Sequence, residues 1–369
     1  MAVWGTPAPP AVEVVGLVKQ YPKRKDKALD GLTFKVNRGE IFGLLGPNGA
    51  GKSTTVGILT TRLRATAGQA KVGGVDVIKN PVAARAQFAV VPQHNNLDRA
   101  LTPRQNLIYH AAYHGVPKAE REKRADTLLE DFGLTKQANA KLDFFSGGMA
   151  QRVMIARALI HSPTVLFLDE PGNALDPQSR LLIRDRVLDL RQRGVTVVLT
   201  THQMNEAAEL VDRVGIVDHG KLLALDTPTN LVRGLAGQSI LDLTVTPAAD
   251  DDPDLVLKVL LELDGVSRGE RLKPTSAPRS TRRAGLTRSE LTWTGEGRRH
   301  LWFGTADALP PATPGSPVRL RLYLGADPAK LLAPALSILS ARSATLNDVH
   351  VAEPDLEDVF ISLTGRDLR

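Results

Sequence analysis

The chain has 369 residues, a formal net charge of +7 and no cysteine. Its length allows two domains at the usual ~100–200 residues per domain, and the missing cysteines exclude disulfides and thiolate metal sites. The longest apolar runs, such as 164–168 and 195–199, are far shorter than the ~20 residues that a membrane-spanning helix needs. Residues 1–10 lack the basic and apolar regions of a secretory signal. We therefore expect a cytosolic chain that does not itself cross a membrane.

Most of the chain has the pattern of an α/β domain. After a lead at residues 1–11, which we expect to be disordered, residues 12–237 alternate short β-branched apolar runs with longer helical patterns. This alternation predicts a mostly parallel sheet flanked by helices. The nearly continuous apolar runs Phe88–Val91, Thr164–Leu168 and Val195–Thr200 are typical of strands that are covered on both faces.

A glycine-rich loop follows the first of the predicted core strands, Glu40–Leu45, and precedes a helical run. The loop fits the P-loop pattern G-x-x-x-x-G-K-[ST] in the strand–loop–helix context that this pattern requires. Its backbone N–H groups can wrap phosphates at a helix N-terminus, where the helix dipole favours negative charge. Lys52 would contact the β- and γ-phosphates, and Ser53 would hold Mg²⁺. The expected nucleotide-contacting residues are Gly46, Pro47, Asn48, Gly49, Ala50, Gly51, Lys52, Ser53 and Thr54.

Strand signals disappear in the next part of the chain. Thr102 is a predicted N-cap, Pro103 occupies the first helical position, and Gln105 completes a capping box. We therefore expect an inserted helical subdomain at about residues 95–160. Near its end, Ser146 is the predicted N-cap of a helix whose first turn could bind an anion through free N–H groups.

Two adjacent carboxylates, Asp169 and Glu170, directly follow the apolar run 164–168 at the end of the predicted strand. Such a pair would be costly inside a core but suits the carboxyl end of a strand that faces a nucleotide and its metal ion. Asp169 suits the metal, and Glu170 suits a general base that positions the attacking water. A solvent-facing or helix-capping acid pair is the alternative.

The region 240–369 predicts a small α+β domain with a basic insertion. The insertion, Arg268–Arg299, contains nine Lys or Arg residues against three Glu, and we expect it to be a mobile, solvated loop. Binding to anionic lipid headgroups is the alternative. The expected elements are strands at Leu241–Val245, His300–Gly304, Val318–Leu324 and Leu346–Val351, and helices at Leu255–Leu263, Pro328–Ala341 and Asp355–Leu363.

The run Ser-Gly-Gly-Met-x-Gln-Arg from Ser146, followed by a Leu-Asp-Glu-Pro, resembles the signature helix of the ATP-binding-cassette (ABC) family. The resemblance covers roughly Glu13–Gly234. It implies a P-loop NTPase fold that binds ATP and Mg²⁺, in which two domains face each other head to tail. Ser146, Gly147 and Gly148 would then complete the P-loop site of the second copy.

The same resemblance assigns roles to isolated residues whose types alone would mean little. Gln93 matches the family's Q-loop, which touches the metal or the water and links the site to the helical subdomain. His202 matches the switch histidine that contacts the γ-phosphate. Tyr21 matches the aromatic residue that stacks on adenine, although a lone tyrosine is more often a packing residue.

Asp176 matches the family's D-loop, which contacts the opposite subunit. The preceding stretch departs from the family pattern, because Gly172 and Ala174 replace the more usual Thr and Gly. The segments 90–98 and 353–360 are similar to those of the daunorubicin-resistance and nodulation-factor export subfamilies, of ABC-2 type. This similarity implies an exporter subunit at the cytoplasmic face of the cell membrane, bound to a permease on a separate chain and to a second copy of itself.

Other classes of ABC ATPase fit the sequence less well. A soluble ATPase acting on the ribosome or on nucleic acid is supported only by the basic insertion, so we expect no nucleic-acid partner. A chromosome-maintenance ATPase would need a long coiled coil, but no heptads separate the P-loop from the signature. An inactive scaffold would not need Lys52, Asp169, Glu170 and His202.

Overall fold

The computed structural model describes residues 9–365, except for 23, 174, 236–238, 249–250, 273–315 and 326. The chain divides into two compact units, Met1–Leu231 and Val232–Asp367. The division falls inside α8 (Pro228–Arg233), a helix in which none of the described residues is buried. It therefore lies slightly before residue 237, where we expected the first domain to end.

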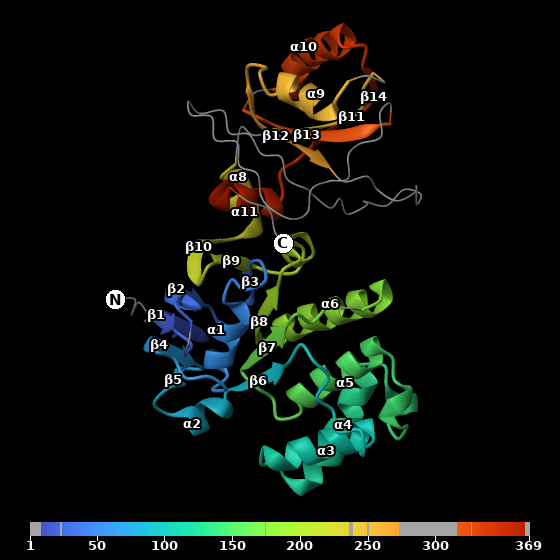
Figure 1. Cartoon of the computed structure of the whole chain (residues 1–369). Coiled ribbons are helices and arrows are strands. Elements are labelled where there is room, and N and C mark those ends of the chain that lie inside the picture. Colours follow the sequence, from blue (N-terminus) through green and yellow to red (C-terminus); the bar gives the residue numbers. More distant parts are fainter. Residues whose placement is uncertain are drawn as a thin grey trace, which may run out of the picture. The chain divides into compact units, whose positions relative to one another are not determined.

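The first unit is built on a sheet in which the described strands have the order β10-β9-β3-β8-β7-β6 (Figure 1). Neighbouring strands from β9 to β6 are parallel, and β10 is antiparallel to β9. All residues of β3 and β7 are buried, as their continuous apolar sequences require. The strands are β3 (Ile41–Leu45), β6 (Phe88–Val91), β7 (Val165–Asp169), β8 (Thr196–Thr201), β9 (Arg213–Asp218) and β10 (Lys221–Asp226).

A second, antiparallel sheet shares the hydrophobic core of this unit. Its order is β2-β1-β4-β5, formed by β1 (Val12–Lys19), β2 (Leu29–Val36), β4 (Ala67–Val72) and β5 (Val75–Asp76). Phe34 of β2 stacks on Phe42 of β3 with ring centroids 5.4 Å apart, which joins the two sheets. The expectation of a disordered lead is wrong for its last residues, because Ala11 is buried and its N–H donates to the Val36 carbonyl. Residues 1–8 lie outside the described residues.

Helices α3, α4 and α5 gather beside the β6 and β7 edge of the sheet (Figure 1). The predicted capping box is present at α3: the Thr102 hydroxyl accepts from the Gln105 N–H, and the Gln105 side chain accepts from the Thr102 N–H. The helices of this unit before α8 are α1 (Lys52–Leu59), α2 (Pro81–Arg85), α3 (Pro103–Tyr113), α4 (Lys118–Asp131), η1 (Thr135–Gln137), η2 (Leu142–Phe144), α5 (Gly147–Leu159), α6 (Pro177–Gln192) and α7 (Met204–Ala208).

The second unit has the topology of a ferredoxin-like fold. Its described strands are all antiparallel to their neighbours in the order β12-β13-β11-β14, so β11 and β12 run parallel with β13 between them. With α9 and α10 as the crossovers, this is a split βαβ arrangement. The elements are β11 (Ser239–Thr246), α9 (Pro253–Leu260), β12 (Val266–Leu272), β13 (Val318–Leu324), α10 (Pro328–Ala341), β14 (Thr345–Ala352) and α11 (Leu356–Thr364).

Strand β12 corrects the expected start of the basic insertion. Residues 268–272, which we assigned to a mobile loop, pair with β13. Their charges have partners inside the unit: fully buried Glu270 lies 3.5 Å from the Arg268 guanidinium and accepts from the Tyr323 hydroxyl at 2.8 Å. The Arg271 guanidinium lies 3.5 Å from the Asp254 carboxylate. The rest of the expected insertion and the strand expected at 300–304 lie outside the described residues. None of the described helices is long and apolar enough to cross a membrane.

Candidate functional site

The loop between β3 and α1 has a backbone that only glycine can follow at two positions. A Cβ on Gly46 would lie 2.1 Å from the Val217 carbonyl oxygen. Gly51, the N-cap of α1, has a φ of 108°, and a Cβ there would lie 2.7 Å from the Ala28 carbonyl oxygen. The loop is thus held tightly against neighbouring backbone, with its N–H groups at the start of a helix.

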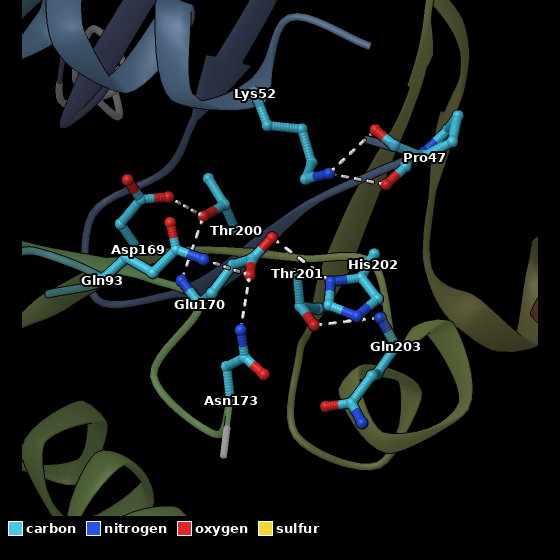
Figure 2. Close-up of polar contacts among 11 residues, drawn as sticks. Pro47, Lys52, Gln93, Asp169, Glu170, Asn173, Thr200, Thr201, His202 and Gln203 are labelled. Atoms are coloured by element: carbon cyan, nitrogen blue, oxygen red, sulfur yellow. Dashed lines mark hydrogen bonds and ion pairs between the residues drawn. The ribbon is translucent and has the colours of Figure 1, made fainter. Parts of the chain in front are cut away.

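Lys52 is the first residue of α1 and is buried at the centre of the site. Its ammonium group donates to the backbone carbonyls of Gly46 at 2.7 Å and Pro47 at 3.0 Å (Figure 2). Burial lowers the pKa of Lys52, while the nearby carboxylates of Glu170 and Asp169 act in the opposite direction. The buried cation is therefore held by loop carbonyls that it can exchange for a ligand.

The carboxyl end of β7 presents the two predicted carboxylates. Asp169 is 6% exposed, and its carboxylate accepts from the Thr200 hydroxyl at 2.5 Å. Glu170 has a φ of 50°, a region that non-glycine residues rarely adopt, and its N–H donates to the Thr200 carbonyl at 3.0 Å. Backbone strain of this kind persists only where the surrounding structure holds it, and it is frequent at active sites.

Three side chains converge on the Glu170 carboxylate within the described part of the chain (Figure 2). Gln93 donates from the loop after β6 at 2.9 Å, Asn173 donates at 3.3 Å, and Nδ1 of His202 lies 3.2 Å from the other oxygen. His202 is the first residue after β8. The carboxyl ends of three parallel strands therefore bring Gln93, Glu170 and His202 together, as the topology of a parallel sheet allows.

Two members of this cluster were missed by sequence reasoning. Thr200 pairs directly with Asp169 in the register of β7 and β8, so the predicted strands could have revealed it once their register was known. Asn173 has no such signal, because its contact with Glu170 depends on how the loop after β7 turns back.

The remaining predicted residues lie outside the polar cluster of Figure 2. Ser146 is the N-cap of α5, as predicted, and its hydroxyl accepts from the Met149 N–H at 3.2 Å. Gly147 and Gly148 begin that helix, and a Cβ on Gly148 would lie 2.0 Å from the Ser179 hydroxyl oxygen.

Asp176 is the N-cap of α6, and its carboxylate accepts from the Ser179 N–H at 2.9 Å and from the Ser179 hydroxyl at 2.6 Å. These bonds lower the pKa of Asp176. The Tyr21 hydroxyl lies 3.3 Å from the Thr54 hydroxyl, and the Lys19 ammonium lies 5.1 Å from the Tyr21 ring centre. Tyr21 is thus placed beside α1, the helix that follows the P-loop.

Comparisons with known proteins agree with this arrangement. The ABC transporter family model matches residues 29–173. The linearmycin resistance ATP-binding protein LnrL of Bacillus subtilis is 40% identical over 235 residues, which are 64% of this chain and 75% of that protein. The chain belongs to the ABC transporter family. It is an ATP-binding, ATP-hydrolysing subunit, and its expected fold class is confirmed.

Further ABC proteins are similar over comparable lengths. The doxorubicin resistance ATP-binding protein DrrA of Mycobacterium tuberculosis is 42% identical, covering 68% of this chain and 75% of that protein. The Nod factor export ATP-binding protein I of Ralstonia nicotianae is 40% identical, covering 64% and 74%. The predicted resemblance to these two groups is confirmed.

A dimeric ATP-binding cassette in a post-hydrolysis state with ADP and Pi aligns with a TM-score of 0.54 and 28% identity. The alignment covers 58% of this chain and 98% of that one.

Proposed function

We propose that this chain drives an exporter by hydrolysing ATP with Glu170 as the general base. The observation that carries the proposal is the Glu170 carboxylate, which is held by Gln93, Asn173 and His202 at the end of β7 beside Asp169. A carboxylate fixed in this way can orient a water molecule and accept its proton as the water attacks the γ-phosphorus. The bond from the γ-phosphorus to the bridging oxygen then breaks, and ADP leaves with that electron pair.

Lys52 would bind the β- and γ-phosphates by exchanging its bonds to the Gly46 and Pro47 carbonyls. Because the ammonium group is already buried, much of its desolvation cost is met before ATP arrives. The N–H groups at the start of α1 would bind the same phosphates, and His202 would contact the γ-phosphate. Tyr21 would lie against the adenine ring.

The residues present fit a magnesium ion. Asp169 supplies a buried carboxylate, and the side chains of Ser53 and Gln93 offer further oxygen atoms, the ligand type that Mg²⁺ prefers. When bound, Mg²⁺ would offset the negative charge of the phosphate oxygens.

The residues Ser146–Gly148 support a head-to-tail dimer, because they lie outside the polar cluster around Lys52 and would serve the site of a second copy. The N–H groups in the first turn of α5 would there bind the γ-phosphate of the partner's ATP. Asp176 would lie at the same interface. Closure and opening of this dimer would drive a membrane-spanning permease on a separate chain, with the ATPase subunit bound at the cytoplasmic face of the membrane. Export is supported by the names of the relatives, which include resistance and Nod factor export proteins.

Purification under mild detergent from the native membranes tests the assembly. We expect a polytopic membrane protein to co-purify, together with ATPase activity that vanadate inhibits. The Lys52→Ala variant, purified in the same way, should retain the membrane partner and lose the activity. Co-purification of ribosomes or nucleic acid instead of a membrane protein would overturn the exporter proposal and favour a soluble ABC ATPase.

A further inference from the structure

Three histidines converge in the helical part of the first unit, outside the polar cluster around Lys52 and Glu170. His110 lies in the last turn of α3, His114 is the C-cap of that helix, and His161 follows α5. One ring nitrogen from each can be chosen so that all three lie within 4.8 Å of one another, and all three residues are partly buried. The His114 and His161 rings stack with centroids 3.9 Å apart, and the His110 and His114 centroids are 4.6 Å apart. We call these residues the histidine cluster.

The two nitrogens of His161 differ in their surroundings. Nε2 lies 3.4 Å from the Phe88 carbonyl oxygen, which can only accept, so the tautomer protonated at Nε2 satisfies this contact. Nδ1 is buried and has no hydrogen-bond partner among the described residues. An imidazole that donates one N–H to a backbone carbonyl and keeps the other nitrogen as an unused acceptor has the form of a metal ligand.

The surroundings also keep the rings neutral. Burial lowers the pKa of His110 to about 3 and that of His161 to about 4, and it lowers the pKa of His114 as well. Arg157 adds a positive field at His110, while its guanidinium group donates to the backbone and side-chain oxygens of Asn96. The field of Arg157 opposes any cation, so the selection rests on ligand type: neutral imidazole nitrogens are poor ligands for hard ions such as Mg²⁺ or Ca²⁺ but suit zinc-class ions.

We propose that His110, His114 and His161 bind a divalent transition-metal ion of the zinc class, with water completing the coordination. Zinc bonds nitrogen at about 2.0–2.1 Å, so tetrahedral ligands lie roughly 3.4 Å apart. The three nitrogens, which lie within 4.8 Å of one another, must therefore move closer together when the ion binds. One of the two stacked rings must also rotate to point its lone pair at the ion.

Such an ion would connect elements that lead to the ATP site. It would tie α3 to the turn after α5, and His161 also contacts the carbonyl of Phe88 in β6. Gln93, which donates to Glu170, follows β6 closely in the chain. The bound ion would thus brace the helical group against the strand that carries Gln93.

Metal titration of the full-length, untagged chain tests the site directly and needs no ATP hydrolysis. Chelator-stripped protein should bind one Zn²⁺ per chain in calorimetry, in the presence of excess Mg²⁺. Co²⁺ should give the visible absorption of a tetrahedral complex. His114→Ala and His110→Ala should each weaken Zn²⁺ binding at least roughly tenfold, because even partners of metal ligands contribute 10- to 100-fold.

Two control variants separate this site from others. His350→Ala removes an exposed histidine of β14, and His202→Ala removes the histidine beside Glu170. Both should keep the wild-type affinity for Zn²⁺. The circular dichroism spectrum of each variant checks that it is folded. The proposal is overturned if the wild type binds no Zn²⁺, or if Zn²⁺ binding survives in His114→Ala and His110→Ala; the cluster is then only a packed group of neutral rings.

Discussion

The two units of the chain both bury charged side chains but use them differently. In the C-terminal unit the charges are matched within the fold: Arg321 makes two bonds to Asp242 at 2.6 and 2.7 Å, and Tyr323 bonds Glu270. In the ATP-binding unit, Lys52 bonds only to loop carbonyls among the described residues, while two carboxylates lie nearby. The charges of the C-terminal unit thus have charged or hydroxyl partners, whereas the proposed site pairs its buried cation with neutral carbonyls, which a ligand could replace.

The largest difference between the units should appear in the rate of ATP hydrolysis when one carboxylate in each unit is made neutral. Glu170→Gln keeps the shape of the side chain but removes the proposed proton acceptor, and we expect ATP hydrolysis to fall by about 10²- to 10⁴-fold. ATP binding should persist, and ATP should hold the dimer closed. Glu270→Gln is the matched control, because it neutralises a buried carboxylate in the other unit; folded protein should hydrolyse ATP at the native rate. Native hydrolysis by Glu170→Gln in the assembled complex would show that another residue is the base.

Removal of a core side chain should distinguish the units through stability. Leu320 of β13 is fully buried, and Leu320→Ala should cost about 2–5 kcal/mol of unfolding free energy in the C-terminal unit. Urea unfolding followed by circular dichroism should show that the C-terminal unit of the variant unfolds at a lower urea concentration than in the wild type. Binding of a fluorescent ATP analogue should be lost only at the urea concentration at which the wild type loses it. Leu255→Ala, at a position that is 43% exposed, should shift neither transition much. Loss of both signals together in Leu320→Ala would mean that the two units unfold as one.

Lys52→Ala tests whether the buried cation of the ATP-binding unit serves a ligand rather than the fold. A hydrogen bond to a charged group is worth about 1.5–3 kcal/mol, so ATP affinity should fall roughly 10- to 150-fold. The stability of the empty protein should not fall, because the variant also removes a buried ammonium group. Lys71→Ala breaks a partly exposed contact with Glu13 and should leave ATP affinity unchanged. Unaltered ATP binding by Lys52→Ala would remove Lys52 from the proposed site.

Much of the first unit could be predicted because its signals are local. Each core strand is a continuous apolar run, and the P-loop and the capping box at Thr102 have fixed spacings. The catalytic and binding roles assigned to the site residues remain predictions. What sequence reasoning missed depends on contacts between distant segments. Thr200 reaches Asp169 through strand register, and His161 meets His110 and His114 only in the folded chain.

In the second unit, one strand could not be predicted from its local sequence. Strand β12 looks like a charged loop, since Arg268, Glu270 and Arg271 interrupt any apolar alternation. Its pairing with β13 becomes understandable only once Tyr323 and Asp254 are seen to offer partners for these charges. A polar strand of this kind cannot be recognised from its own residues, because the groups that make its burial tolerable come from other elements.

The smallest expected effect concerns an ion pair of the C-terminal unit and its dependence on pH. Arg342 bonds both oxygens of Asp251 and thereby lowers the pKa of Asp251 from its usual value of 3.8. A lowered carboxyl pKa stabilises the folded state above the usual pKa, and this contribution is lost as the pH falls through the lowered value. Asp251→Asn should therefore raise the unfolding equilibrium constant of this unit at pH 7, by less than roughly tenfold, as for partly exposed ion pairs. Below the lowered pKa the variant and the wild type should become equally stable. Urea unfolding at pH 7 and at a pH below the lowered pKa measures the effect. If the stability difference between variant and wild type persisted in acid, it would come from packing rather than from charge.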